Sequence, residues 1–231
     1  MNWGGAVIGV LVIVGVVSLV WYTIAKERAQ ALEREQRALE RGWAYSRSGG
    51  LYSLQGSEGG ASWTLVVHSS QKNRPAKGVW KADSPSLPGG VVAVGSKAMA
   101  FFLKNPLGNR LAQWGMRVSV SGEDVTRAWN RLVEGCEEVD TGDADFASRY
   151  AVLATDTAQA RKLLSGEVIR AVLEWDGRHK LGRAFQGEVE ILWSDAGLMV
   201  TWNGSPLLKP DDMAGFVELC LGIHGPLNRG W

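Results

Sequence analysis

No charged side chain occurs among the first 25 residues of this chain, and the segment from Gly4 to Ala25 is almost wholly apolar. Because His, Asp, Glu, Lys and Arg are all missing there, the segment has no ligand for a haem and no proton relay. Its length of about 22 residues suits a transmembrane helix, which needs roughly 20. A cleaved signal peptide would be shorter, with a basic start and small residues where bulky Trp21 and Tyr22 stand. We therefore expect an uncleaved transmembrane anchor over residues 1–25.

Aromatic residues stand near both ends of the apolar segment. Trp3 and the pair Trp21 and Tyr22 are separated by about 27 Å of helix at 1.5 Å per residue, so they are predicted to be membrane-interface anchors. Gly5 and Gly9 form a small-xxx-small pair that allows a second helix to pack closely. The alternative is that glycine is simply common in such helices.

Basic residues follow the apolar segment, and none precedes it. This asymmetry predicts an N-terminus outside the membrane and a cytoplasmic C-terminal domain, in a bacterial inner membrane. Cysteine is scarce, with only Cys136 and Cys220, so there is no disulfide framework of the kind found in small secreted domains. The sequence leaves open a single disulfide between the two. The basic residues next to the segment are Lys26, Arg28, Arg34, Arg37 and Arg41.

Residues 26–42 form a stalk rich in Ala, Leu, Glu, Arg and Gln, which are good helix formers. The helix is predicted to continue out of the membrane and to end at Gly42. One stripe follows a heptad-like spacing, although it is too short for a coiled coil by itself. The stalk either packs one face on its own domain or packs against a partner. The stripe consists of Ala25, Ala29, Leu32, Gln36 and Leu39.

The rest of the chain has the composition of an ordinary globular domain, with a net charge of +1. Its apolar alternation and turn signals predict an α+β fold of antiparallel strands with several helices. Residues 43–120 are expected to form a strand-rich subdomain and residues 121–231 an α+β subdomain with a C-terminal helix and an irregular tail. Strands are expected at 43–46, 51–54, 62–68, 78–81, 91–94, 149–154, 185–193 and 198–202. Helices are expected at 96–103, from 121, at 156–164, at 165–175 and from 211.

One stretch resembles a recurring bacterial pattern. Phe146, Tyr150 and Val152 form F-x3-Y-x-V, Asp156 begins a D-x3-A-x2-L-L helix, and a hairpin turns at Gly197. This resembles uncharacterised membrane-anchored bacterial domain families of unknown function. The resemblance implies a fold and no activity, and it assigns no functional residue.

Chemical motifs are few. The three histidines have no second His or Cys at metal-ligand spacing and are expected to be surface or strand residues. No P-loop and no dinucleotide fingerprint occurs, so we expect no cofactor, no metal, no catalytic residue and no enzymatic activity. The acidic stretch from Glu134 to Asp145 lacks the spacing of a calcium loop and is expected to be a solvated linker. The histidines are His68, His179 and His224.

Tryptophan is abundant, with 11 residues. Most lie in predicted elements, where they either fill the core or mark an interface. Trp231 follows a Pro- and Gly-containing tail with little local core, so it is a candidate for docking onto a partner.

These features predict a non-enzymatic, single-pass accessory or structural subunit of a larger integral-membrane complex, for which a respiratory or photosynthetic complex is a plausible host. Its expected partners are that complex and, through one helix, the lipid bilayer. Near-neutral charge argues against nucleic acid, and a small-molecule ligand is not expected. The alternatives are a membrane-tethered sensor of a ligand or peptide, favoured by a deep pocket lined by Trp63, Trp80 or Trp193, and an enzyme whose site is unrecognised.

Overall fold

The computed structural model describes residues 3–49, 51–68, 77–83, 87, 89–97, 135–179, 189–203 and 209–228, with side chains from Val12 onward. In chain order the elements are α1 (Trp3–Glu40), β1 (Ala44–Ser48), β2 (Leu51–Glu58), β3 (Ala61–His68), β4 (Lys77–Ala82), β5 (Val92–Ser96), β6 (Glu137–Glu138), α5 (Ala144–Arg149), β7 (Tyr150–Ala154), α6 (Thr157–Leu163), α7 (Gly166–Arg178), β8 (Val189–Ser194), β9 (Gly197–Asn203) and α8 (Pro210–Asn228).

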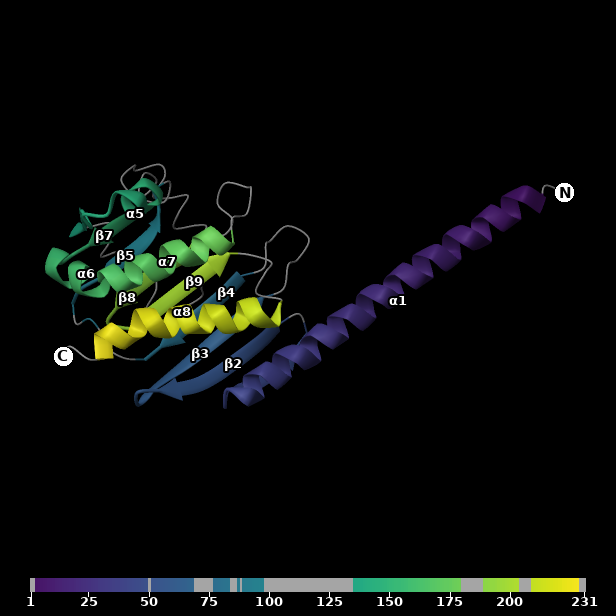
Figure 1. Ribbon diagram of the computed structural model, residues 1–231, viewed down its shortest axis with the longest axis horizontal. Coiled ribbons are helices and arrows are strands. Elements are labelled where there is room, and N and C mark those ends of the chain that lie inside the picture. Colours follow the sequence, from purple (N-terminus) through teal and green to yellow (C-terminus); the bar gives the residue numbers. More distant parts are fainter. Residues whose placement is uncertain are drawn as a thin grey trace.

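The strands form one antiparallel sheet of nine strands in the order β1-β2-β3-β4-β9-β8-β5-β7-β6. Helices α6, α7 and α8 lie over one face of it, while α1 leaves the domain and projects far beyond it (Figure 1). The mixed α+β class and the antiparallel strands were expected. Strand β4 of the first half pairs with β9 near the C-terminus, so both halves of the chain contribute to the same sheet.

The core lies between this sheet and the helices. In β3 the side chains of Ala61, Trp63, Leu65 and Val67 are buried and alternate with more exposed ones, as the period of two requires. Asp156 caps α6 and Ser165 caps α7, at the positions where two helices were predicted to begin. Helix α8 is apolar on nearly every side and is buried accordingly.

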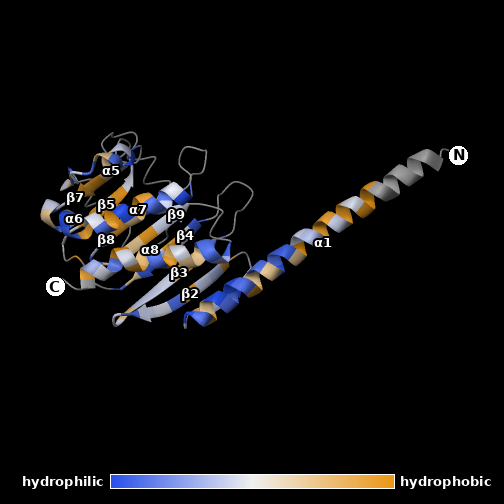
Figure 2. Cartoon of the chain, viewed as in Figure 1, coloured by the Kyte–Doolittle hydropathy of each residue, from blue (hydrophilic) through white to orange (hydrophobic). Residues whose placement is uncertain are grey.

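No helix in the described part of the chain combines the length and apolarity needed to span a membrane. The prediction of a transmembrane helix is therefore wrong, and so is the inner-membrane placement with the N-terminus outside and the domain in the cytoplasm. The part of α1 without charged residues ends at Ala25, and charged residues occur among apolar ones from Lys26 onward. Figure 2 shows this change along the helix, where hydrophilic segments appear between hydrophobic ones.

Several predicted elements differ from the structure. The acidic stretch is not a simple linker, because it contains β6 and leads into α5, which Asp143 caps. The tail was expected to be irregular from Gly225, but α8 continues through Pro226 to Asn228. The helices predicted at 96–103 and from 121 lie outside the described residues, apart from 96 and 97.

Candidate functional site

The junction between α1 and the domain joins distant parts of the described chain through both packing and polar contacts. Ala31, Arg34 and Ala38 lie on one stripe of α1 and are buried against the domain. Their spacing of three and four residues gives one continuous face. Arg34 Cζ lies 5.1 Å from the ring centre of Tyr52 on β2, a cation–π distance. The stalk therefore packs on its own domain, one of the two arrangements that the sequence left open.

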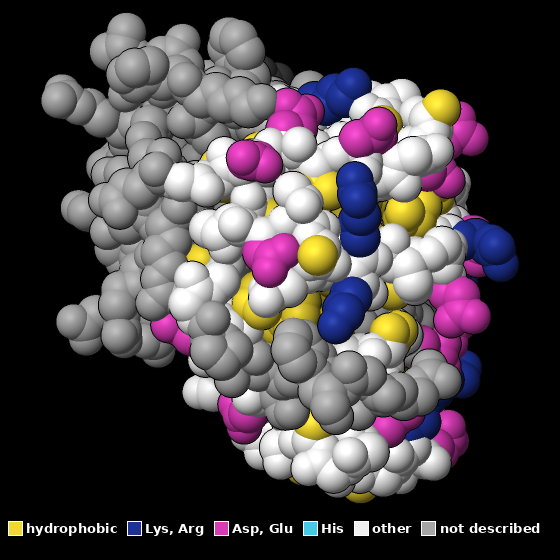
Figure 3. All heavy atoms as spheres, turned by 90° about the vertical axis from the view of Figure 1, so that its left-hand side faces the viewer, with side chains coloured by type: hydrophobic (Ala, Val, Ile, Leu, Met, Phe, Trp, Pro, Cys, Tyr) yellow, Lys and Arg dark blue, Asp and Glu magenta, His cyan; other side chains and the backbone are white. Residues whose placement is uncertain are grey.

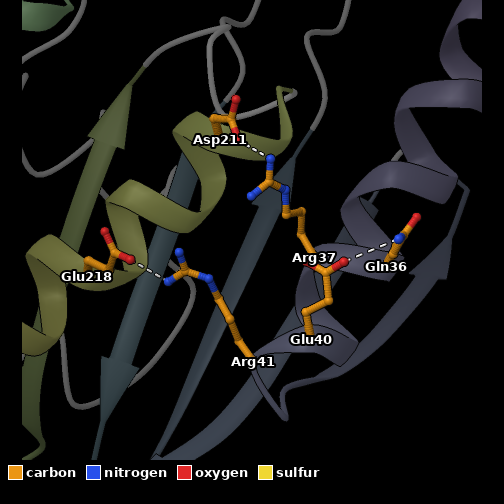
Figure 4. A network of polar contacts seen from close by, with 6 residues as sticks. All are labelled: Gln36, Arg37, Glu40, Arg41, Asp211 and Glu218. Atoms are coloured by element: carbon orange, nitrogen blue, oxygen red, sulfur yellow. Dashed lines mark hydrogen bonds and ion pairs between the residues drawn. The ribbon is translucent and has the colours of Figure 1, made fainter.

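Arg37 of α1 and Arg41, which follows the end of α1, both reach α8 (Figure 4). Arg37 Nη2 lies 2.9 Å from Asp211 Oδ1, and Arg41 Nη1 donates to Glu218 Oε1. Arg41 Cζ is also 5.2 Å from the ring centre of Trp43. Because all four charged side chains are at least one-third exposed, each pair contributes only about 0.2–1 kcal/mol. The pairs fix the angle of α1, and the buried stripe supplies most of its attachment.

The end of α1 is defined by a glycine. Gly42 has a φ of +71°, which favours glycine over residues with a side chain. The Trp43 N–H donates to the Ala38 carbonyl over 2.8 Å, and the Gly42 N–H donates to Leu39 over 3.0 Å. This is a Schellman motif. It turns the chain from α1 directly into β1 and places Trp43 beside the domain.

A hollow of about 510 Å³ opens at this turn, between the residues that follow α1, the β2–β3 hairpin and α8. Its lining offers carboxylates, one guanidinium, an indole and two glycines, and the lining contains no His, Cys, Ser or Lys. It can hydrogen-bond a polar group but brings no nucleophile–base pair together. The lining residues are Arg41, Trp43, Glu58, Glu218, Leu221, Gly222 and Gly225.

The histidines differ from the sequence prediction. Only His68 is an exposed strand residue, while His179 and His224 are mostly buried in helical segments. His179 closes α7, with Nδ1 2.9 Å from the Trp175 carbonyl oxygen and Nε2 3.0 Å from Asp212 Oδ1. Its ring packs 4.0 Å from that of Trp175, measured between centres. His179 therefore joins α7 to α8.

The cysteines, the potential metal ligands and the charged surface residues are considered in turn. Cys136 and Cys220 are free thiols, and burial raises the pKa of the Cys220 thiol. Among the described residues no group of three potential ligands is placed to hold a metal. On the face formed by α5 and α6, acidic and basic side chains are interspersed among the described atoms (Figure 3).

The residues singled out in the apolar segment lie on α1. Trp21 and Tyr22 are exposed, and their interpretation as membrane anchors depended on the transmembrane helix, which is wrong. Trp3, Gly5 and Gly9 belong to the same helix, but the structure describes side chains only from Val12 onward. Trp231 also lies outside the described residues.

The tryptophans of the sheet domain fill the core. Trp63, Trp80 and Trp193 are buried, so they do not line the deep pocket that a sensor would need. Trp175 and Trp202 are also buried, and their rings meet edge to face at 5.0 Å between centres.

The bacterial pattern around Phe146 and Tyr150 belongs to this core, because both side chains are buried and their rings stack at 4.8 Å between centres. The likeness to uncharacterised families stays a prediction. Comparison of the chain with protein-family models, with curated proteins and with solved structures found no match.

Proposed function

We propose that this chain is a non-enzymatic structural subunit that enters a larger protein assembly through the apolar part of α1. Residues 12–25 of α1, here termed the arm, project away from the domain (Figure 2). One observation carries the proposal: the arm exposes ten large apolar side chains. These are Val12, Ile13, Val14, Val16, Val17, Leu19, Val20, Trp21, Tyr22 and Ile24.

The apolar side chains surround the arm. Successive helical residues are about 100° apart, so Val12, Ile13 and Val14 alone point in three directions. A helix that is apolar on every side is stable only when it is enclosed, whereas a surface helix keeps a polar face. Fully burying one such side chain contributes about 1.5–3 kcal/mol. Since these ten are about half exposed, enclosing the arm is worth on the order of 10 kcal/mol.

The domain has a complementary role. The buried stripe of α1 and its ion pairs to α8 hold the domain at a set angle, so a partner that encloses the arm also positions the sheet domain. The described surface of the domain presents no recognised catalytic arrangement. We therefore assign the sheet domain the role of covering a surface of the partner.

Purification of the tagged full chain under native conditions in mild detergent tests the proposal. We expect stoichiometric co-migration with a larger assembly, and we expect Val16→Glu to abolish it. Leu51→Glu, which places the same charge at an exposed apolar position on β2, is the matched control and should leave co-migration intact. A wild-type chain that migrates without other proteins, or a Val16→Glu chain that still co-migrates, would contradict the proposal.

A further inference from the structure

The heptad-like stripe that the sequence predicts on the stalk faces away from the domain. Its side chains are all exposed, with Leu32 at 68% and Leu39 at 67%. At 100° per residue, this stripe is centred about 150° from the buried stripe that contains Ala38. Docking of α1 on its own domain therefore leaves this second face open. We call the face the outer seam: Ala25, Ala29, Leu32, Gln36 and Leu39.

The outer seam is longer in the structure than in the sequence prediction. Because α1 is one continuous helix, the same heptad spacing continues upstream through Tyr22, Ser18 and Gly15. A Cβ built on Gly15 would meet no atom within 4 Å, so this position is open. Between residues 12 and 39 the seam spans about four heptads, or roughly 42 Å.

We propose that the outer seam binds a second copy of this chain, with the two α1 helices parallel and in register. Leu32 and Leu39 then each meet their own equivalent, as d positions do in a parallel pair. Arg28 occupies a g position, and in the parallel pair it lies opposite Glu33 of the second copy, which occupies an e position. Because the pair is two-fold symmetric, this ion pair forms twice. Both side chains are exposed. A second copy therefore matches the seam in charge as well as in apolar spacing.

Charge alone would allow the opposite orientation. An antiparallel pair would match Arg28 with Glu35 and Lys26 with Glu33, whereas the parallel pair sets Glu35 against Glu40. Exposed ion pairs contribute little, however, and salt screens them. Apolar burial decides between the two orientations, because it scales with the area removed from water.

The antiparallel pair that makes these charge matches buries less of the helix. With Ala29 opposite Leu32, it overlaps only residues 22–39, about 27 Å, because α1 ends at Glu40. The parallel pair also covers four exposed flanking side chains of the arm. It then buries apolar surface on the order of 1,000 Å², the lower limit of a specific interface. The flanking residues are Val12, Val14, Leu19 and Trp21.

Disulfide trapping of the full chain tests the register. Under mild oxidation Leu32→Cys should give a covalent dimer, while Glu27→Cys, exposed on the side of α1 away from the seam, should not. The wild-type chain controls for Cys136 and Cys220. If Leu32→Cys cross-links no faster than Glu27→Cys, or if Leu32→Cys pairs only when mixed with an Ala29→Cys chain, the parallel dimer is refuted.

Charge substitutions provide a second test, read by light scattering of the detergent-solubilised chain at low salt. Glu35→Lys converts the like pair with Glu40 into an attractive one and should lower the dissociation constant about tenfold. Arg28→Glu should raise it about tenfold. A weaker dimer with Glu35→Lys would indicate the antiparallel pair and overturn the proposal.

Self-association does not depend on the proposed assembly. Val16 lies opposite the outer seam, so Val16→Glu should leave the cross-linking of Leu32→Cys unchanged while it abolishes co-migration. Loss of both together would contradict the assignment of the two faces.

Discussion

Gly197 lies where an added side chain would meet the backbone of the neighbouring strand, and its replacement by alanine tests the central strand pairing. Gly197 ends the β8–β9 turn with a φ of +92°, and a Cβ placed on it would lie 2.3 Å from the carbonyl oxygen of Ala82 on β4. The left-handed conformation costs a non-glycine residue about 1–2 kcal/mol. The contact involves backbone, so β4 and β9 must separate locally, which adds about 1–3 kcal/mol as for other overpacking.

The expected total for Gly197→Ala is about 2–5 kcal/mol, a large fraction of the 5–15 kcal/mol that stabilises a typical domain. Urea unfolding followed by tryptophan fluorescence measures it, because the buried indoles report on the core. Gly60→Ala is the matched control: it lies in the β2–β3 hairpin with a φ of +84°, but a Cβ there meets nothing within 4 Å. It should lose only about 1–2 kcal/mol. Equal losses for the two variants would refute the role of the contact with Ala82.

Three further predictions concern capping, attachment of α1 and ionisation. Asp156→Ala removes the side chain that accepts from the Ala158 N–H at 2.8 Å, so it should lower the unfolding free energy by about 0.5–2 kcal/mol, measured by urea denaturation. Ala38→Leu at a fully buried position should destabilise the docked α1 by about 1–3 kcal/mol, more than Arg37→Ala at an exposed ion pair, as limited proteolysis at the junction would detect. Burial raises the pKa of Tyr52, opposed by Arg34, so folded Tyr52 keeps its proton above pH 10, where the unfolded chain loses it. Stability should therefore fall as pH rises beyond about 10, and Tyr52→Phe should reduce that slope.

Much of the sheet followed from local signals. The β8–β9 hairpin alternates apolar and other residues around a short turn, and the caps Asp156 and Ser165 use side chains whose role is set by their neighbours. Such features depend on a few adjacent residues. They are therefore visible without knowledge of the fold.

The order of the strands was not predictable in the same way. Pairing of β4 with β9 joins residues more than 110 positions apart, and no local pattern specifies it. The burial of His224 and the partial burial of His179 likewise depend on packing by α7, α8 and the sheet. The hollow beside Trp43 was missed because its lining comes from three separate segments, and the only local signal was the glycine spacing of α8.

The exposed apolar surface of the described residues is concentrated on α1. The sequence left the tryptophans open as core or interface, but the five described in the sheet and its helices are buried. Among the described residues of the domain, Leu51 is the only large apolar side chain classed as exposed, and the others lie on α1. A contiguous exposed apolar surface marks an interaction site, whereas a single residue does not. Substitutions on the arm and the outer seam should therefore change association without changing the stability of the domain, and Gly197→Ala should do the reverse.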